Sequence, residues 1–218
     1  RDGIHKFYND PELWNPQEPV KNQFFGSWSS MKPSRLSGFA THDENDPYQL
    51  NEEERPFDKP QDLALGFLRK NKDRPFFLNY CPYYVHGPIQ TRDRKRFELY
   101  LKKMGEDFPS DPGPIYRGKS GHSNPYYASM VDTVDWMIGQ IITYLEETDD
   151  PRNPGHKLID NTYIIVDSDN GGVSRHTDNA PLKGGKQNTW EGGVRIPFLV
   201  SGPGVTPGST CKTPINLI

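Results

Sequence analysis

An alternation of helical and strand-like segments between residues 60 and 200 constrains the fold of this chain more than any other feature. Residues 126–147 carry apolar side chains three or four positions apart, and this spacing predicts one long helix whose buried stripe includes Val131. Residues 161–166 form a short β-branched run of the kind found in buried strands. Helices that alternate with such strands predict an α/β fold with a mainly parallel sheet flanked by helices.

Weaker signals place the remaining elements. Proline is common in the first turn of a helix, and a short continuous apolar run is typical of a buried parallel strand. Residues 1–57 show no sustained period, so we expect them to be a loop-rich segment of the same domain as residues 58–218. The expected elements, in order, are a helix from Pro60, a strand at 75–81, a helix after Arg92, a Gly/Pro/Ser loop at 105–122 and a strand at 194–200.

Composition narrows the functional classes. The net charge of −3 argues against a nucleic-acid partner, because such proteins normally present a basic face. No apolar run is long enough to cross a bilayer, so we expect no membrane span. The apolar fraction is only 33%, with 21 Pro and 20 Gly, which suits a domain cut away from part of its core. The chain begins at Arg1 without a signal peptide, so we interpret it as an excerpt.

Polar residues concentrate where the predicted strands end. In an α/β sheet, ligands bind beyond the carboxyl ends of the strands. His86 follows the predicted strand at 75–81, and Asp167-Ser168-Asp169-Asn170-Gly171-Gly172 follows the strand at 161–166. The Gly-rich segments 182–186 and 190–195 come soon afterwards. We therefore expect the functional site among these segments.

Each of these residues also has an ordinary structural explanation. Asp169-Asn170-Gly171 has the composition of a simple turn, although its carboxylate and amide oxygens would also suit a hard divalent cation. His86 would bond to a backbone carbonyl, contact an anionic substrate or protonate a leaving group. Lys186 would be merely solvated, or would neutralise an oxyanion beside the preceding glycines. The residues alone leave these alternatives open.

Taken together and in this order, the segments resemble the sulfatase family of the alkaline phosphatase superfamily. The matching pieces cover roughly residues 60–205, and the last two are highly specific. They are Pro75 to Pro88, Tyr127 to Leu145, Thr162 to Gly172 with its SDNGG motif, and Asn179 to Pro197 with its NAPLKGGK and WEGGVRIP motifs. The resemblance implies an incomplete alkaline phosphatase-like α/β fold, in which residues 58–218 are the later half of the catalytic domain.

The resemblance also implies roles for individual residues. Asp169 and Asn170 would be calcium ligands, while Lys186 and His86 would be the catalytic groups that contact sulfate oxygens, His86 close to the leaving oxygen. Asp167 stands where the family usually has Ser or Thr, and its part in the site stays open.

Other residues, within the matching segments or in the loop after Gly172, would lie around that site. Glu191 and Arg195 match positions that we interpret as an ion pair or a loop brace. His176 and Trp190 are candidates to contact the substrate, which would be a sulfated small molecule or a sulfated glycan. A periplasmic or secreted location is what the resemblance implies; the chain itself carries no signal that tests it.

The nucleophile expected of a sulfatase is not in this chain. It is a formylglycine made from the Cys or Ser of a C/S-x-P-x-R motif, and Met31 occupies that position in the nearest match, residues 31–35. We therefore expect the chain to need the missing N-terminal half of its own domain and to be inactive alone. A phosphoesterase of the same superfamily and a non-catalytic sulfatase-like binding protein are the alternatives.

Overall fold

The structure is a computed structural model that describes residues 59–82, 84–86, 89, 94–107 and 122–215. The predicted loop segment 1–57 and its Met31 lie outside these residues, as does most of the predicted loop at 105–122. The described chain divides into two compact units. The first holds the described residues of 59–63, 80–107 and 124–136, and the second holds those of 64–79, 122–123 and 137–215.

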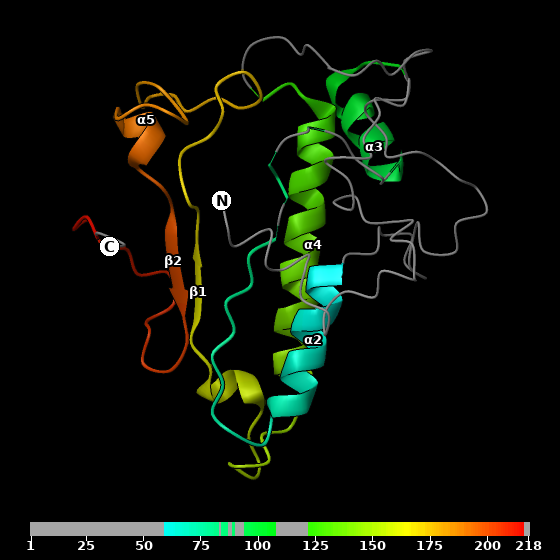
Figure 1. The fold of residues 1–218 in the computed structure, drawn as a ribbon, viewed down its shortest axis with the longest axis vertical. Helices are drawn as coiled ribbons and strands as arrows, with labels where there is room; N and C mark the ends of the chain where they lie inside the picture. Colours follow the sequence, from blue (N-terminus) through cyan, green and yellow to red (C-terminus); the bar gives the residue numbers. More distant parts are fainter. Residues whose placement is uncertain (1–58, 83, 87–88, 90–93, 108–121, 216–218) are drawn as a thin grey trace, which may run out of the picture. The chain divides into compact units, whose positions relative to one another are not determined.

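The helices predicted from hydrophobic periodicity are present. They are α2 (Lys59–Asn71), α3 (Arg94–Met104) and α4 (Pro125–Glu147) (Figure 1). Each begins or ends within a few residues of its predicted bounds, as expected for elements whose signal is local and repeated over several turns.

A capping interaction fixes the start of α4. The Asn124 Oδ1 accepts the backbone N–H of Tyr127 at 3.1 Å, and Pro125 occupies the first helical position. Pro lacks the N–H that would be unsatisfied there, and the Asn oxygen satisfies one of the remaining free donors. The segment thus leaves its loop and enters the helix at one defined residue.

Replacing Asn124 with alanine is expected to lower the free energy of unfolding by about 1 kcal/mol, because the Tyr127 N–H loses its acceptor. Urea denaturation followed by circular dichroism measures the change. Thr143→Ala on the exposed face of α4 is the matched control, and it should leave stability unchanged or raise it by a few tenths of a kcal/mol. Equal stability of the two variants would contradict the cap.

The buried face of α4 differs slightly from the predicted stripe. Its buried side chains include Met130, Thr133, Met137 and Leu145, which keep a spacing of three or four residues or a multiple of it. Val131, predicted to be in the stripe, is 45% exposed. The buried Thr133 hydroxyl donates to the Ser129 carbonyl at 2.9 Å, so a polar residue is accommodated on this face without an unsatisfied hydroxyl.

In the first unit, α3 packs against the first half of α4. The Phe97 ring stacks on the Tyr126 ring with centroids 4.3 Å apart, and Leu101 joins the same buried cluster. Beside it, the Asp132 carboxylate accepts hydrogen bonds from Arg96 Nε at 3.2 Å and from the Tyr100 hydroxyl at 3.0 Å. An apolar stack flanked by three half-buried polar side chains therefore holds the two helices together.

The core of the second unit is built from three buried leucines. Leu68 of α2, Leu145 of α4 and Leu158 of the short 3-10 helix η1 (Leu158–Asn161) form one cluster. Partly buried side chains that pack against it are Phe76, Leu78, Ile141, Tyr144, Ile159 and Ile164. The strand that precedes the candidate site is thus anchored to this core through Ile164.

The sheet differs from the predicted one. Among the described residues it has two strands, β1 (Ile164–Asp167) and β2 (Phe198–Ser201), and they pair antiparallel, with Ile164 opposite Ser201 and Asp167 opposite Phe198 (Figure 1). The mainly parallel arrangement expected from sequence does not hold for this pair. Parallel neighbours need a long crossover, usually a helix, whereas the segment between β1 and β2 has only the single-turn helix α5 (Glu191–Val194).

Two strand predictions need correction. Residues 75–81 are extended but pair with no strand among the described residues, and only alternate side chains reach the core: Phe76 and Leu78 pack against it, while Phe77 is 87% exposed. The predicted strand at 194–200 starts later, at Phe198, because the residues before Arg195 form α5. Strand propensity was present in both segments, but pairing depends on partners elsewhere in the chain.

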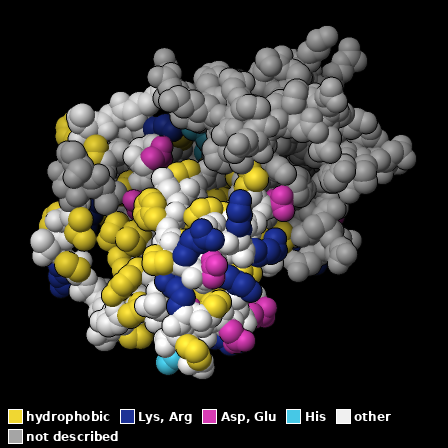
Figure 2. All heavy atoms as spheres, turned by 60° about the horizontal axis from the view of Figure 1, so that its bottom comes forward, with side chains coloured by type: hydrophobic (Ala, Val, Ile, Leu, Met, Phe, Trp, Pro, Cys, Tyr) yellow, Lys and Arg dark blue, Asp and Glu magenta, His cyan; other side chains and the backbone are white. Residues whose placement is uncertain are grey.

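The C-terminal end of α2 carries a basic surface. Arg69 and Lys70 lie in its last turn, where positive charge interacts favourably with the helix dipole, and the Arg69 guanidinium lies 5.9 Å from the Tyr144 ring centroid. Figure 2 brings this end of the molecule forward and shows Lys and Arg side chains interspersed with hydrophobic and acidic ones. Of the helices that the structure describes, none is long and apolar enough to cross a membrane.

Candidate functional site

The turn after β1 presents the two predicted metal ligands. Asp169 is exposed and Asn170 is half-buried. The Ser168 hydroxyl donates to the Asn170 carbonyl at 2.9 Å, and the Gly171 N–H donates to the Gly193 carbonyl at 2.9 Å. These bonds close the turn and fasten it to the helix α5 region, so the Asp169 carboxylate extends from a fixed backbone.

A second segment joins this turn through its backbone. The Lys186 N–H donates to the Gly172 carbonyl at 2.9 Å, and the Gly192 N–H donates to the Lys183 carbonyl at 2.9 Å. Lys186 itself is half-buried. The structure therefore brings the segment that carries Lys186 next to the turn that carries Asp169 and Asn170.

Glycines make this close approach possible. A Cβ at Gly185 would lie 2.6 Å from the Gly172 carbonyl oxygen, and a Cβ at Gly171 would overlap the Gly192 carbonyl oxygen. Real Cβ atoms do not approach backbone oxygens that closely, so the three backbone segments can meet only where side chains are absent. The Gly-Gly pairs that the sequence shows are thus explained by backbone packing.

Asn179 contacts both segments. Its Nδ2 donates to the Gly172 carbonyl at 2.9 Å and to the Gly184 carbonyl at 3.1 Å. Asn179 belongs to the NAPLKGGK motif, and no role for it was expected from the sequence. The sequence feature that points to Asn179 is its position between two glycine-rich segments. Glycines have no side chains to hold such segments together, so a neighbouring polar side chain is a candidate to bond to their backbone.

An aromatic–cation pair borders the same segment. The Lys183 Nζ lies 3.4 Å from the Trp190 ring centroid, within the range of a cation–π contact, and Trp190 is 53% exposed. Arg195 Nη1 and Glu191 Oε2 are 3.5 Å apart, which confirms the predicted ion pair. Both partners are exposed, so the pair contributes little to stability and serves at most to brace α5.

The two candidate histidines lie in different units. His86 is exposed and belongs to the first unit, whereas Lys186, Asp169 and Asn170 belong to the second. His176 is half-buried in the second unit. Burial lowers the pKa of its imidazole below the ordinary 6.5, and the adjacent positive charge of Arg175 lowers that pKa further. His176 is therefore mainly neutral at neutral pH.

The metal-binding potential of the site is partial. A carboxylate and an amide oxygen on adjacent residues suit a hard divalent cation, and such an ion takes about six to eight oxygen ligands when it is calcium. Within the described ranges, no group of three or more His, Cys, Asp or Glu side chains could hold a metal ion. Asp169 and Asn170 have the donor atoms for only part of such a site. Asp167 is exposed at the end of β1.

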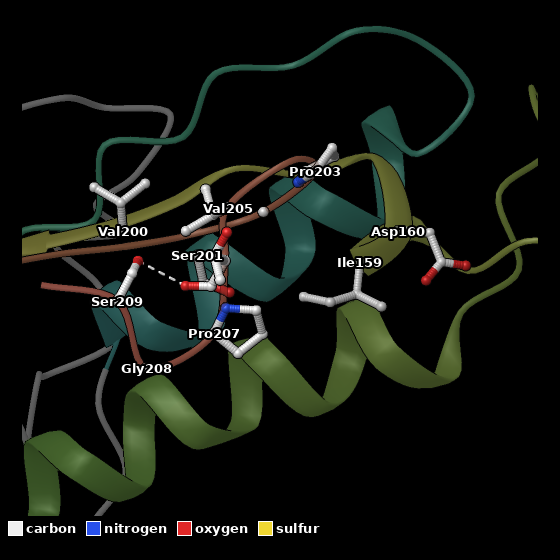
Figure 3. Close-up of a pocket in the computed structure, with 11 residues that line it drawn as sticks. Ile159, Asp160, Val200, Ser201, Pro203, Val205, Pro207, Gly208 and Ser209 are labelled. Atoms are coloured by element: carbon white, nitrogen blue, oxygen red, sulfur yellow. Dashed lines mark hydrogen bonds between the residues drawn. The ribbon is translucent and has the colours of Figure 1, made fainter.

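A shallow pocket of about 420 Å³ lies at the other end of β2 (Figure 3). Ile159, Asp160, Val200 and the loop 201–209 line it. The Ser209 hydroxyl donates to the Thr206 carbonyl at 2.7 Å across this loop. None of the predicted site residues lines this pocket, so it is separate from the candidate site.

Comparison with known proteins gives a consistent result. The sulfatase family model matches residues 4–218. A sulfatase of Formosa agariphila is 33% identical over 156 residues, which are 70% of this chain and 26% of that protein. Steryl-sulfatase of Rattus norvegicus is 31% identical over 163 residues, 70% of this chain and 23% of that protein. N-acetylgalactosamine-6-O-sulfatase of Bacteroides thetaiotaomicron is 31% identical over 153 residues, 64% of this chain and 24% of that protein.

Solved structures agree. Ps i-CgsB in complex with k-i-k-neocarrahexaose matches with a TM-score of 0.50 and 32% identity, over 66% of this chain and 27% of that one. The alkaline phosphatase-like α/β fold predicted from sequence is thereby confirmed, and the chain spans about a quarter of the length of the relatives that it matches. Sulfatases are sulfuric ester hydrolases that generally use a metal ion. This chain belongs to the sulfatase family.

Proposed function

We propose that this chain supplies the later part of the active site of a sulfuric ester hydrolase. The proposal rests on the contact between the Lys186 segment and the Asp169–Asn170 turn, which we call the junction. In it, the Lys186 N–H donates to the Gly172 carbonyl at 2.9 Å. The junction brings the Lys186 side chain and the two side chains that we propose as metal ligands onto adjoining backbone. An anion that bridges a metal and an ammonium group is what such an arrangement binds.

Lys186 is proposed to bind sulfate oxygens. Its ammonium group is positively charged at neutral pH, and it offers three hydrogen-bond donors to an anion. Half-buried placement strengthens such an interaction, because less water competes for the same oxygens. As the S–O bond breaks, this charge would stabilise the negative charge that develops on the oxygens.

Asp169 and Asn170 are proposed to be calcium ligands, together with ligands from outside this chain. When bound, the ion would act as a Lewis acid on the sulfate oxygens. The chain's own contribution is to hold both oxygen donors on a turn whose backbone is fixed by the Gly171–Gly193 hydrogen bond. Rigid placement of ligands limits how much entropy is lost when the ion binds.

His86 is proposed to act near the leaving oxygen. It is exposed, and an imidazole is the side chain best suited to give a proton to a leaving group near neutral pH. Trp190 and His176 are proposed to contact the organic part of the substrate. An exposed indole offers a flat apolar surface for a sugar or aryl ring, so a sulfated glycan or another sulfated small molecule would fit.

The nucleophile is proposed to come from polypeptide outside this chain. No C/S-x-P-x-R motif occurs in the 218 residues, and Met31 at the nearest match cannot be converted to formylglycine. Lys186, Asp169 and Asn170 are proposed to bind and orient a sulfate ester, but none of them, nor His86, matches the position of the attacking group that the resemblance implies. We therefore expect the chain alone to bind a sulfate ester without hydrolysing it.

Titration with inorganic sulfate, followed by amide chemical shifts in the NMR spectrum, tests this proposal. Sulfate should shift the Lys186 amide and the amides of the 169–172 turn, with a larger effect when calcium is present. Lys186→Met should remove these shifts, whereas Lys212→Met at an exposed position should not. Absence of any shift at Lys186 would contradict the proposal, and stronger shifts with phosphate would favour the phosphoesterase alternative.

A further inference from the structure

We propose that Asn179 is a positioning residue that sets where Lys186 stands relative to the Asp169–Asn170 turn. The inference rests on the proposed function, since it concerns the geometry of the same site. Asn179 precedes the Lys186 segment in the chain and follows the metal-ligand turn, so its side chain lies between the two in sequence as well as in space.

The two donors of the Asn179 amide are divided between the two segments. One donates to the carbonyl of Gly172, directly after the turn that carries Asp169 and Asn170, at 2.9 Å. The other donates to the carbonyl of Gly184, two residues before Lys186, at 3.1 Å. A side-chain amide has two N–H donors on one nitrogen, so a single residue can join both segments.

The Gly172 carbonyl is the shared point of this junction. It accepts from Asn179 Nδ2 and also from the Lys186 backbone N–H, both at 2.9 Å. A carbonyl oxygen has two lone pairs, and these two donors occupy them. Any change at Asn179 therefore acts directly on the acceptor that holds the Lys186 backbone.

Two other backbone bonds, from Gly192 N–H to the Lys183 carbonyl and from Gly171 N–H to the Gly193 carbonyl, link the segments only through α5, so the direct contact between the segments is narrow. The contact is made by glycines: a Cβ at Gly185 would be 2.6 Å from the Gly172 carbonyl oxygen and 2.8 Å from Asn179 Nδ2. Glycines bury almost no apolar surface, so the junction depends on hydrogen bonds. Both donors of the Asn179 amide bond to backbone carbonyls, so the effect of Asn179 on sulfate binding would pass through the position of Lys186.

Two substitutions separate the functions of the side chain. Asn179→Ala removes both donors. Asn179→Asp keeps the volume but places a carboxylate against two carbonyl oxygens, which repels them while the carboxyl is ionised. Protonation of that carboxyl would restore one donor, and its pKa should be raised because the ionised form is the disfavoured one. Asn179→Asp should thus recover part of the junction as the pH falls.

Hydrogen exchange and sulfate titration of the whole chain test the inference. In Asn179→Ala, exchange of the Lys186 amide should rise about tenfold and sulfate should bind several-fold more weakly to the folded chain. Asn188→Ala is the matched control: the Asn188 Oδ1 accepts from the Gly185 N–H at 3.3 Å, within the Lys186 segment only. This variant should leave sulfate affinity close to that of the unmodified chain.

The outcomes are distinguishable. If the Lys186 amide of Asn179→Asp regains protection from hydrogen exchange at low pH, relative to the unmodified chain, the result supports a positioning role. A purely structural role would instead lower the unfolding midpoint of the variants without changing the sulfate affinity of the folded chain. Unchanged exchange at Lys186 in both variants overturns the inference. If the unmodified chain shows a protected Lys186 amide but no sulfate response, the proposed function fails instead, while the hydrogen-bonded junction stands.

Discussion

Replacing Lys186 with methionine is expected to lower kcat/KM for hydrolysis of an aryl sulfate by about 100- to 1000-fold, when this chain is part of a polypeptide that also carries the C/S-x-P-x-R segment. Methionine keeps much of the length of the side chain and removes the charge. The loss is large because the ammonium would face oxygens whose negative charge increases in the transition state. Steady-state kinetics measures it.

Two further variants make this prediction specific. Lys212→Met removes a charge from an exposed position in the same unit and should leave kcat/KM unchanged. Lys186→Arg keeps the charge but presents a wider planar group, so it should retain only part of the activity. If Lys186→Met and Lys212→Met were equally active, Lys186 would have no part in sulfate binding.

Replacing Gly171 with alanine is expected to destabilise the chain by about 1–3 kcal/mol, because the added Cβ has no room. It would overlap the carbonyl oxygen of Gly192 and lie 3.0 Å from the Cα of Gly193, and both are backbone atoms that cannot rotate away. The turn and α5 must separate, and the 2.9 Å bond from Gly171 N–H to the Gly193 carbonyl would be lost. Urea denaturation measures the change.

Gly139→Ala is a control of the opposite sign. Gly139 lies inside α4, and nothing is within 4 Å of a Cβ added there. Alanine favours a helix interior over glycine by about 0.8–1 kcal/mol, so this variant should be more stable than the unmodified chain. If Gly171→Ala were as stable as Gly139→Ala, the close packing of the turn on α5 would be contradicted.

The helices could be predicted from sequence because their signal is local. The apolar spacing of 126–147 and the proline at residue 60 led to α4 and α2. Strands were harder. The run 75–81 has the composition of a buried strand, yet Phe77 is 87% exposed and the segment pairs with no described strand. Strand pairing depends on a partner distant in the chain, and local propensity does not identify that partner.

The candidate site was only partly predictable, for a related reason. The SDNGG and NAPLKGGK motifs directed attention to Asp169, Asn170 and Lys186, and the backbone of these two segments is joined in the structure. The role that we propose for Asn179 could not be predicted, because it rests on two contacts with backbone carbonyls. Nothing in the residue type distinguishes such a contact from an ordinary loop asparagine.

The expected dependence on an outside nucleophile follows from the same residues. Lys186 and the Asp169–Asn170 turn are proposed to bind and polarise a sulfate ester, and the motif that the resemblance implies for the attacking group is absent from the 218 residues. We therefore expect sulfate binding to be measurable in this chain without hydrolysis of a sulfate ester.

Turnover of an aryl sulfate tests directly whether this chain carries only the accessory part of the site. It compares the chain alone with the same chain continued by a polypeptide that carries the formylglycine motif and its acidic metal ligands, both in the presence of calcium. We predict no hydrolysis above background by the chain alone, and hydrolysis that depends on Lys186 in the longer polypeptide. Hydrolysis by the chain alone, abolished by Lys186→Met, would contradict the claim that it carries only the accessory part of the site.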